Sequence, residues 1–221
     1  MRIKNLELYL NHLNNCLEGK YENSFWQALH NTILKFNLSP NYFTDLLSAF
    51  KQDVVKNRYH NFDELINYCE RSANPVGRII LELFSIRDEE SLRFSDAICT
   101  ALQLTNFYQD ISIDSKKNRI YVPLEELRKF GVSENQFEFM ENNTNFEKLL
   151  EFQVTRAEQL FSEGRNLLPG LPKELRAQIK MTILGGEKIL KKIKQSNFGV
   201  IDFRPKLSKT DYMIIFLRAI A

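Results

Sequence analysis

Apolar residues recur at helical spacing along nearly the whole chain, and this feature excludes most other folds. In the first stretch Leu6, Leu10, Leu13 and Leu17 follow one another at intervals of three or four residues, which places them on one face of a helix. No strand-like alternation persists and no unit repeats, while only 8 Gly and 6 Pro interrupt 221 residues. We therefore predict an all-α helical bundle, with residues 1–221 forming a single domain.

Turn residues divide this pattern into segments. Pro75 and Gly77 should kink the longest N-terminal helix, because proline removes a backbone hydrogen bond. Residues 118–123 should form a loop, since Pro123 starts the next helix. Ser95 is the expected N-cap of the helix that follows it. The predicted helices cover residues 6–19, 25–36, 41–56, 61–84, 96–113, 124–130, 145–168, 173–195 and 209–221.

Charge and cysteine content exclude several classes of protein. Lys and Arg number 30 against 28 acidic residues, so no basic surface for nucleic acid is indicated. Cys16, Cys69 and Cys99 lie far apart without a CxxC pair, which favours reduced, buried thiols over zinc or disulfides. No apolar run reaches the roughly 18 residues of a membrane span. We expect a cytoplasmic protein, with peripheral contact at the inner face of the membrane left open and the oligomeric state not predicted.

One helix carries a line of polar residues on an otherwise apolar surface. At about 100° per residue, its polar members fall within an arc of roughly 80°. A helix that is apolar over most of its circumference is normally buried, so this line, which we call the polar stripe, should face an interior cavity. Its members are Asp96, Gln103, Asn106, Asp110 and Asp114.

The spacing within the polar stripe suggests a divalent cation. Burying Asp110 and Asp114 together is costly unless a cation compensates their charge. Mg²⁺ prefers oxygen ligands and commonly joins carboxylates to substrate phosphates. Asn106 offers a further oxygen one turn earlier, and Gln103 a hydrogen bond. The residues thus predict Mg²⁺ and a diphosphate, although a solvated face on a surface helix remains the alternative.

Three segments resemble the squalene/phytoene synthases. ALQLTNFYQDISIDSKKNRIYVP, residues 101–123, resembles the second aspartate-rich motif of that family, and NYCERSANPVG, residues 67–77, resembles its upstream helix. GGEKILKKIKQSNFGVIDFRPKLSK, residues 185–209, resembles its C-terminal helix and Arg-Pro turn. The amino-acid sequences SANPVG and NFYQD are most similar to those of the hydroxysqualene synthase branch of the family.

This resemblance implies an isoprenoid synthase fold and a Mg²⁺-dependent enzyme of hopanoid or squalene biosynthesis. The implied reaction converts presqualene diphosphate to hydroxysqualene with release of diphosphate. Two alternatives remain. One is a head-to-head prenyl transferase that makes presqualene diphosphate or phytoene from prenyl diphosphates such as farnesyl diphosphate, and the other is a non-catalytic helical binding or assembly protein.

The resemblance also assigns roles to individual residues. As catalytic groups it implies Tyr68, Arg119 and Tyr121, the last two donating to the diphosphate. Small or polar residues beside the substrate would be Ser72, Ala73, Gly77, Gln103 and Asn106. The metal ligands would be Asn106, Asp110 and Asp114. Asp53 also matches the family, but we expect it to form a structural ion pair.

Two departures from the family pattern limit what this chain should do. Gln109 stands where the family usually has Arg, which removes a fixed cation near the diphosphate. The family's other aspartate-rich motif, which lies upstream, is not found, and no Asp precedes Asp45. We therefore expect a domain that is N-terminally truncated relative to the family, with weak or absent turnover.

Overall fold

The structure is a computed structural model that describes residues 2–201 and 203–220, and it confirms the all-α prediction. No strand occurs in this part of the chain. Two short 3-10 helices, η1 (Ser115–Lys117) and η2 (Arg165–Gly170), extend the ends of α-helices. The α-helices are α1 (Arg2–Leu17), α2 (Ser24–Phe36), α3 (Pro40–Val55), α4 (Phe62–Ser72), α5 (Asn74–Leu83), α6 (Glu89–Gln109), α7 (Ile111–Asp114), α8 (Leu124–Phe130), α9 (Glu134–Glu138), α10 (Thr144–Gly164), α11 (Lys173–Gln195) and α12 (Lys209–Ile220).

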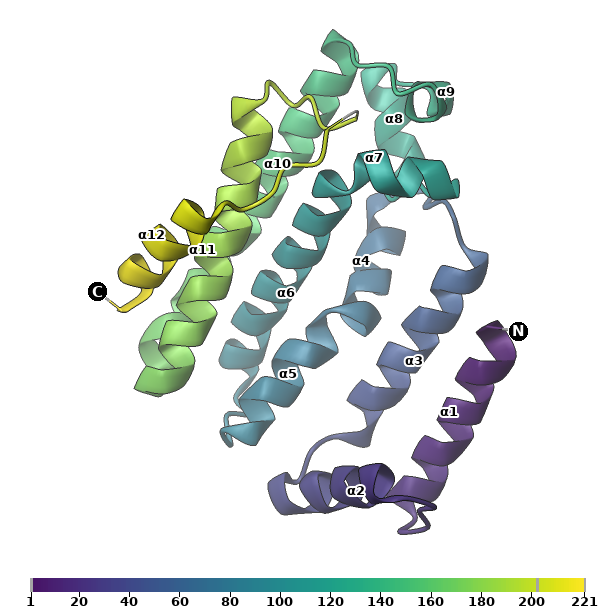
Figure 1. Ribbon diagram of the computed structural model, residues 1–221, viewed down its shortest axis with the longest axis vertical. Helices are drawn as coiled ribbons and strands as arrows, with labels where there is room; N and C mark the ends of the chain where they lie inside the picture. Colours follow the sequence, from purple (N-terminus) through teal and green to yellow (C-terminus); the bar gives the residue numbers. More distant parts are fainter. Residues whose placement is uncertain (1, 202, 221) are drawn as a thin grey trace.

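Helix α6 is the centre of the bundle. It packs against α4, α5, α10 and α11, which surround it in Figure 1. Ile98, Leu104 and Phe107 are all buried, although they point to different sides of the helix. The sequence predicts apolar residues around most of the circumference of this helix. They are buried because other helices pack against it on several sides.

Gly164 allows α10 to approach α6 very closely. A Cβ at this position would lie 2.4 Å from Cγ1 of Ile98 and 3.1 Å from the carbonyl oxygen of Phe94. Any larger side chain would push the two helices apart, so the central contact of the fold depends on the absence of a side chain at this point.

The predicted helix over 61–84 is in fact two helices, and its break lies earlier than expected. Ala73, with φ −121° and ψ −49°, separates α4 from α5. Pro75 stands in the first turn of α5, where its missing N–H costs nothing. Proline therefore begins a new helix here and does not kink an existing one.

The predicted helix over 96–113 is wrong at both ends. Its cap is Asp88, whose side chain accepts a hydrogen bond from the N–H of Ser91, so α6 begins at Glu89 and Ser95 lies buried inside it. At the other end the backbone leaves helical geometry at Asp110, with φ −100° and ψ 10°, before α7 starts. The consequence is a bend at Asp110, just before Asp114, the last aspartate of the polar stripe.

A smaller apolar cluster joins the N-terminal helices. Cys16 and Trp26 are buried in it with Leu13, where the Cys16 thiol donates to the carbonyl of Trp26. All three cysteines are free thiols, and burial raises the pKa of Cys69 to about 12 and that of Cys99 to about 11. The thiols at these two positions therefore stay protonated at neutral pH.

The C-terminal helix is fixed to α11 by one carboxylate. Asp211 pairs with Lys188 at 3.0 Å and Lys192 at 2.8 Å, and it also accepts from the N–H of Ser208. Figure 1 shows α12 lying along α11 at the edge of the molecule opposite α1. Within residues 2–201 and 203–220, no helix has the length and apolar character needed to cross a membrane.

Candidate active site

Three of the predicted site residues converge on Asp53 in α3. The hydroxyl of Tyr68 donates to Oδ2 of Asp53 at 2.8 Å, and that of Tyr121 donates to Oδ1 at 3.3 Å. The guanidinium of Arg119 donates to the backbone carbonyl of Asp53. The sequence alone ranked Asp53 as a structural residue, yet it is the common partner of the three predicted catalytic groups.

The ion pair predicted for Asp53 is not formed. No cationic side chain in the described part of the chain lies within salt-bridge distance of this carboxylate, and nearby Arg58 pairs with Glu134 at 2.5 Å. Tyrosine hydroxyls compensate the charge of Asp53 by hydrogen bonding. A short-range sequence pattern cannot reveal this arrangement, because Tyr121 lies in a distant segment of the chain.

Aromatic rings fix this cluster in place. Phe107 of α6 stacks on Tyr121 with 3.9 Å between ring centroids and 8° between planes. Tyr59 packs against both Tyr68 and Tyr121, at 5.7 and 5.8 Å. Burial is the main cause that raises the pKa of Tyr59, Tyr68 and Tyr121 above the ordinary value, and the charge of Asp53 adds to it. All three hydroxyls therefore stay protonated at neutral pH, where those of Tyr68 and Tyr121 donate to Asp53 and that of Tyr59 accepts from the amide of Gln52.

The loop over 118–123 is confirmed, and backbone hydrogen bonds hold it to the segment after α3. The N–H of Ile120 donates to the carbonyl of Asn57 at 3.0 Å, and that of Leu124 donates to Tyr59 at 2.8 Å. Arg119 donates through its own N–H to Asp114 at 2.9 Å. The loop thus joins the Asp53 cluster to the aspartates that end α6.

Asp110 directly follows α6 and Asp114 ends α7 one turn further on, and each has a cationic partner. Nε of Arg204, from the loop before α12, donates to Oδ1 of Asp110. Lys117 approaches Asp114 at 3.4 Å. Burial raises the pKa of Asp114, an effect that the charge of Lys117 opposes and that of Asp110 reinforces. The two neighbouring carboxylates are therefore compensated by cationic side chains, and burial still raises the pKa of Asp114.

Gln109, which stands where the family usually has Arg, has a structural partner. Its amide nitrogen donates to the carbonyl of Pro205 at 2.5 Å, and its side chain is buried. This bond fixes the Arg-Pro turn against the end of α6 and so presents Arg204 to Asp110. A cation is thus present beside the first aspartate although residue 109 does not supply it.

The polar stripe does not face one interior cavity as predicted. Asn106 is exposed and Gln103 is half-buried. Asp96 forms a two-pronged ion pair with Arg78, at 3.0 and 2.5 Å. The bend at Asp110 changes the direction of Asp114 relative to the other members of the polar stripe. The polar residues therefore do not share the single arc that was calculated for a straight helix.

An apolar cavity of about 150 Å³ lies between α5, α6, η2 and α11. Of the small residues predicted to flank a substrate chain, Gly77 lines this cavity, whereas Ser72 and Ala73 do not. A Cβ at Gly77 would lie 2.4 Å from Oγ of Ser95 and 2.6 Å from Sγ of Cys99. The glycine therefore sets how closely α5 approaches α6 at this cavity. The lining residues are Val76, Gly77, Ile80, Leu81, Ser95, Ile98, Cys99, Leu102, Leu167, Ile179 and Thr182.

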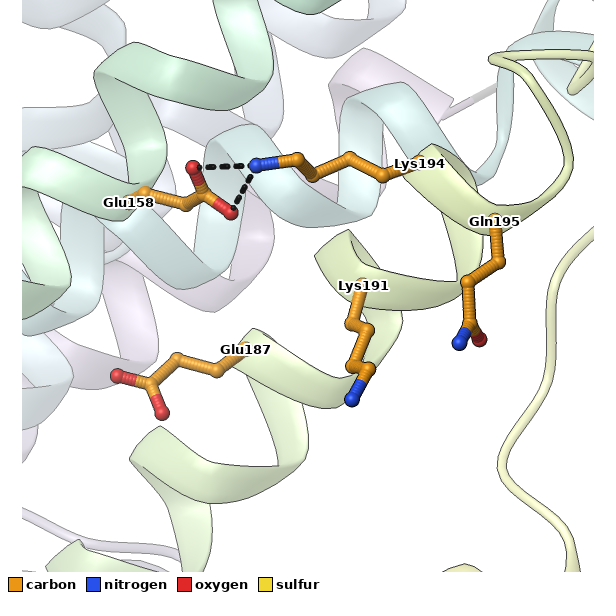
Figure 2. A pocket seen from close by; sticks show the side chains of 5 residues that line it. All are labelled: Glu158, Glu187, Lys191, Lys194 and Gln195. Carbon is orange, nitrogen blue, oxygen red and sulfur yellow. Dashed lines mark hydrogen bonds and ion pairs between the residues drawn. The ribbon is translucent and has the colours of Figure 1, made fainter.

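A larger groove of about 620 Å³ lies on the surface of α11, far in sequence from these residues. Figure 2 shows its side chains, with Nζ of Lys194 bonded to both oxygens of Glu158 at 3.0 and 3.1 Å. Glu187 on the same groove pairs with Arg165. None of the predicted site residues lines this groove, so it is a weaker candidate than the region after α6.

The residues at the end of α6 fit Mg²⁺ that arrives with a diphosphate. No group of three or more His, Cys, Asp or Glu side chains in the described ranges could hold a metal by itself. Mg²⁺, however, is commonly bound by one or two carboxylates together with substrate phosphates. Asp110 and Asp114 supply two such groups, and Asn106 stands one turn earlier.

Taken together, an all-α bundle, paired aspartates at one end of its central helix and an apolar cavity along that helix define an isoprenoid synthase architecture. The comparisons agree. A family model described as squalene/phytoene synthase matches residues 3–211. The chain belongs to the squalene/phytoene synthase family.

The chain is similar to two hydroxysqualene synthases. It is 32% identical over 191 residues to hydroxysqualene synthase of Sinorhizobium fredii and 31% identical over 157 residues to that of Rhodopseudomonas palustris. These alignments cover 85% and 71% of this chain but 65% and 53% of the relatives, so the chain spans less than two thirds of their length.

Among solved structures, squalene synthase HpnC from Alicyclobacillus acidocaldarius is 36% identical and superimposes with a TM-score of 0.87. That superposition covers 90% of this chain and 75% of the other. A dehydrosqualene synthase shares the fold, with a TM-score of 0.89 at 23% identity. The isoprenoid synthase fold predicted from the sequence is therefore confirmed.

Proposed function

We propose that this chain binds a prenyl diphosphate with Mg²⁺ and belongs to an enzyme that converts presqualene diphosphate to hydroxysqualene. The observation that carries the proposal is the arrangement along α6. Leu102, in the wall of the apolar cavity, precedes Asp110 by eight residues, which is about 12 Å along a helix. A diphosphate at the aspartates could therefore extend its isoprenoid chain toward the cavity.

Mg²⁺ bound with the diphosphate would stabilise the negative charge that develops as the carbon–oxygen bond breaks. Asp110 and Asp114 would hold the ion, with Asn106 as a further oxygen donor. Arg204 and Lys117 already lie beside these carboxylates. On binding, each can shift from a carboxylate to a phosphate oxygen, so the cationic charge stays at the leaving group.

The Asp53 cluster would act as the wall of the site. Arg119 and Tyr121 lie on the loop that joins this cluster to Asp114, and their proposed role is to donate to the diphosphate, for which Tyr121 would exchange its 3.3 Å bond to Asp53. Asp53 orients Tyr68 and Tyr121 through its two carboxylate oxygens. Gln103, Ser72, Ala73 and Gly77 would flank the substrate chain.

The hydroxysqualene branch is favoured by the two relatives of that name at 32% and 31% identity. The head-to-head alternative has its own support, because phytoene synthase 2 of rice aligns over 96% of this chain at 26% identity. Since substrates and products of both reactions are lipids, the proposal includes a cytoplasmic location with peripheral contact at the membrane.

Ligand binding by the 221-residue protein tests the proposal without requiring turnover. We expect presqualene diphosphate to bind in calorimetry with 5 mM MgCl₂ and far less with EDTA. Asp110→Asn should weaken this binding by about a hundredfold, since it removes a direct partner of the ion. Asp63→Asn is the matched control, because Asp63 is exposed in the first turn of α4.

Equal binding with and without Mg²⁺, or equal losses in both variants, would contradict the proposal. Product analysis separates the two reactions. Hydroxysqualene formed from presqualene diphosphate supports the favoured one, whereas consumption of farnesyl diphosphate without any hydroxysqualene selects the head-to-head transferase.

A further inference from the structure

Helix α12 presents a row of apolar side chains to solvent. Met213, Phe216, Leu217 and Ile220 stand at positions i, i+3, i+4 and i+7, so they share one face, and all four are exposed. We call this row the outer face of α12. Apolar side chains at this spacing normally point into a core, and the reverse orientation requires an explanation.

The orientation of α12 is fixed by its other face. Asp211, Ile215 and Ala219 recur every four residues and are buried against α11. Asp211 is bonded to Lys188, Lys192 and Ser208. These contacts lower the pKa of Asp211, chiefly through Lys192, and they keep it charged. Rotating the outer face inward would break these bonds, so its exposure follows from the packing.

The exposed charged side chains that the structure describes around the outer face are positive. Lys206, Lys209 and Arg218 are exposed, and none has an ion-pair partner within the described ranges. Asp211 is the only acidic residue in 203–220, and it is buried. Glu187, which lines the cleft between α11 and α12, pairs with Arg165. Phe203 adds another exposed aromatic ring.

We propose that the outer face of α12, together with Lys206, Lys209 and Arg218, docks on a lipid bilayer with anionic headgroups. A helix with an exposed apolar row and basic flanks is suited to lie in the plane of a membrane interface. Its apolar side chains enter the acyl boundary while Lys and Arg meet lipid phosphates. The proposal deepens the membrane contact included in the proposed function, and its test by vesicle binding does not depend on the reaction.

A second copy of the chain fits the same surface poorly. In a two-fold pairing of α12 with α12, Lys209 near one end would approach Arg218 of the other copy. No exposed acid on the helix could compensate these like charges. One face of a 12-residue helix, about 18 Å long and 10 Å wide, is also far below the roughly 800 Å² per partner of a stable interface.

Sedimentation with lipid vesicles tests the proposal on the 221-residue protein. We expect binding to vesicles of phosphatidylcholine with 30% phosphatidylglycerol, and at least tenfold weaker binding to phosphatidylcholine alone. The double substitution Phe216→Glu and Leu217→Glu should reduce partitioning by about tenfold or more, because it places charges in the acyl boundary.

The chain offers a matched control for this variant. Phe25→Glu with Leu34→Glu makes the same two substitutions on α2. Phe25 and Leu34 are 63% and 66% exposed, against 51% and 55% for Phe216 and Leu217. The control has the same net charge and should bind as the unchanged protein does. Circular dichroism establishes that both variants are folded.

A second pair of variants tests the basic flank. Lys209→Gln with Arg218→Gln should weaken binding to the anionic vesicles by roughly fivefold for each cation removed. Lys4→Gln with Lys35→Gln, at exposed positions of α1 and α2, should change it less than twofold. Raising the salt concentration should weaken binding in the same direction.

Three results would overturn the proposal. They are equal binding to neutral and anionic vesicles, equal losses in the α2 controls, and no vesicle binding by the unchanged protein. Light scattering identifies the competing occupant, because a dimer that Phe216→Glu and Leu217→Glu dissociate would assign the outer face of α12 to a second copy.

Discussion

Two carboxylate sites lie at the ends of the 118–123 loop, and they are held in different ways. Asp53 accepts from the hydroxyls of Tyr68 and Tyr121 among stacked aromatic rings. Asp110 is held by the long side chain of Arg204, with 28% and 33% of the two side chains exposed. The packed tyrosine rings hold Asp53 in one arrangement. The flexible side chain of Arg204, in contrast, can be replaced at Asp110 by another cation.

The two sites should therefore lose very different amounts of stability on substitution. We expect Asp53→Ala to lower the free energy of unfolding by about 2–4 kcal/mol, because it leaves two hydroxyls without an acceptor. Asp110→Ala should cost less than about 1 kcal/mol, as for other partly exposed ion pairs. Urea unfolding followed by circular dichroism measures both, and equal losses would remove the distinction.

Alkaline pH should affect the Asp53 cluster selectively. The pKa of Tyr59, Tyr68 and Tyr121 is raised in the folded state, so folding favours their protonated forms. Their contribution to stability is complete below the unfolded pKa of about 10 and is lost as pH rises above it. Tyrosinate absorbance at 295 nm should show these groups ionising together with unfolding, and early ionisation in the folded protein would contradict this.

The two hydroxyls should also differ from each other. Tyr68→Phe removes a bond of 2.8 Å from a buried ring, and we expect a loss of about 1–2 kcal/mol. Tyr121→Phe removes a longer bond of 3.3 Å and should cost less than half as much. Thermal unfolding of both variants and of the double variant measures their coupling through Asp53.

The smallest expected effect has the opposite sign. Burial raises the pKa of Asp114, so its charged form opposes folding until a cation arrives. Asp114→Asn should raise the free energy of unfolding by up to about 1 kcal/mol at pH 7 while weakening Mg²⁺-dependent ligand binding. A stability loss instead would show that Lys117 contributes more than burial costs.

The sequence predicts the helices better than it predicts the contacts at their ends. Leu124–Phe130 and Lys173–Gln195 are found with the predicted bounds, because proline or glycine marks a boundary of each. The break at Ala73 and the bend at Asp110 have no such mark, and both arise where a helix meets its neighbours. The short helix α9 was also not predicted.

For the candidate site, the residue types were predictable and their partners were not. Asp110 and Asp114 are identified by spacing within the chain. Asp53 is not, since its meaning depends on Tyr121, 68 residues away. The position of Arg204 beside Asp110 likewise depends on the Gln109–Pro205 hydrogen bond, which joins residues 96 positions apart. Long-range hydrogen bonds of this kind leave no periodic signal in a sequence.

The hydrogen bonds between the 118–123 loop and the segment after α3 have a consequence for local opening. Ile120 and Leu124 donate their backbone N–H groups to Asn57 and Tyr59, so neither segment can leave without exposing the other. The two should open as one cooperative unit. Amide hydrogen exchange at Ile120 and Leu124 would then proceed at a common, slow rate, although residues 118–123 have no regular secondary structure.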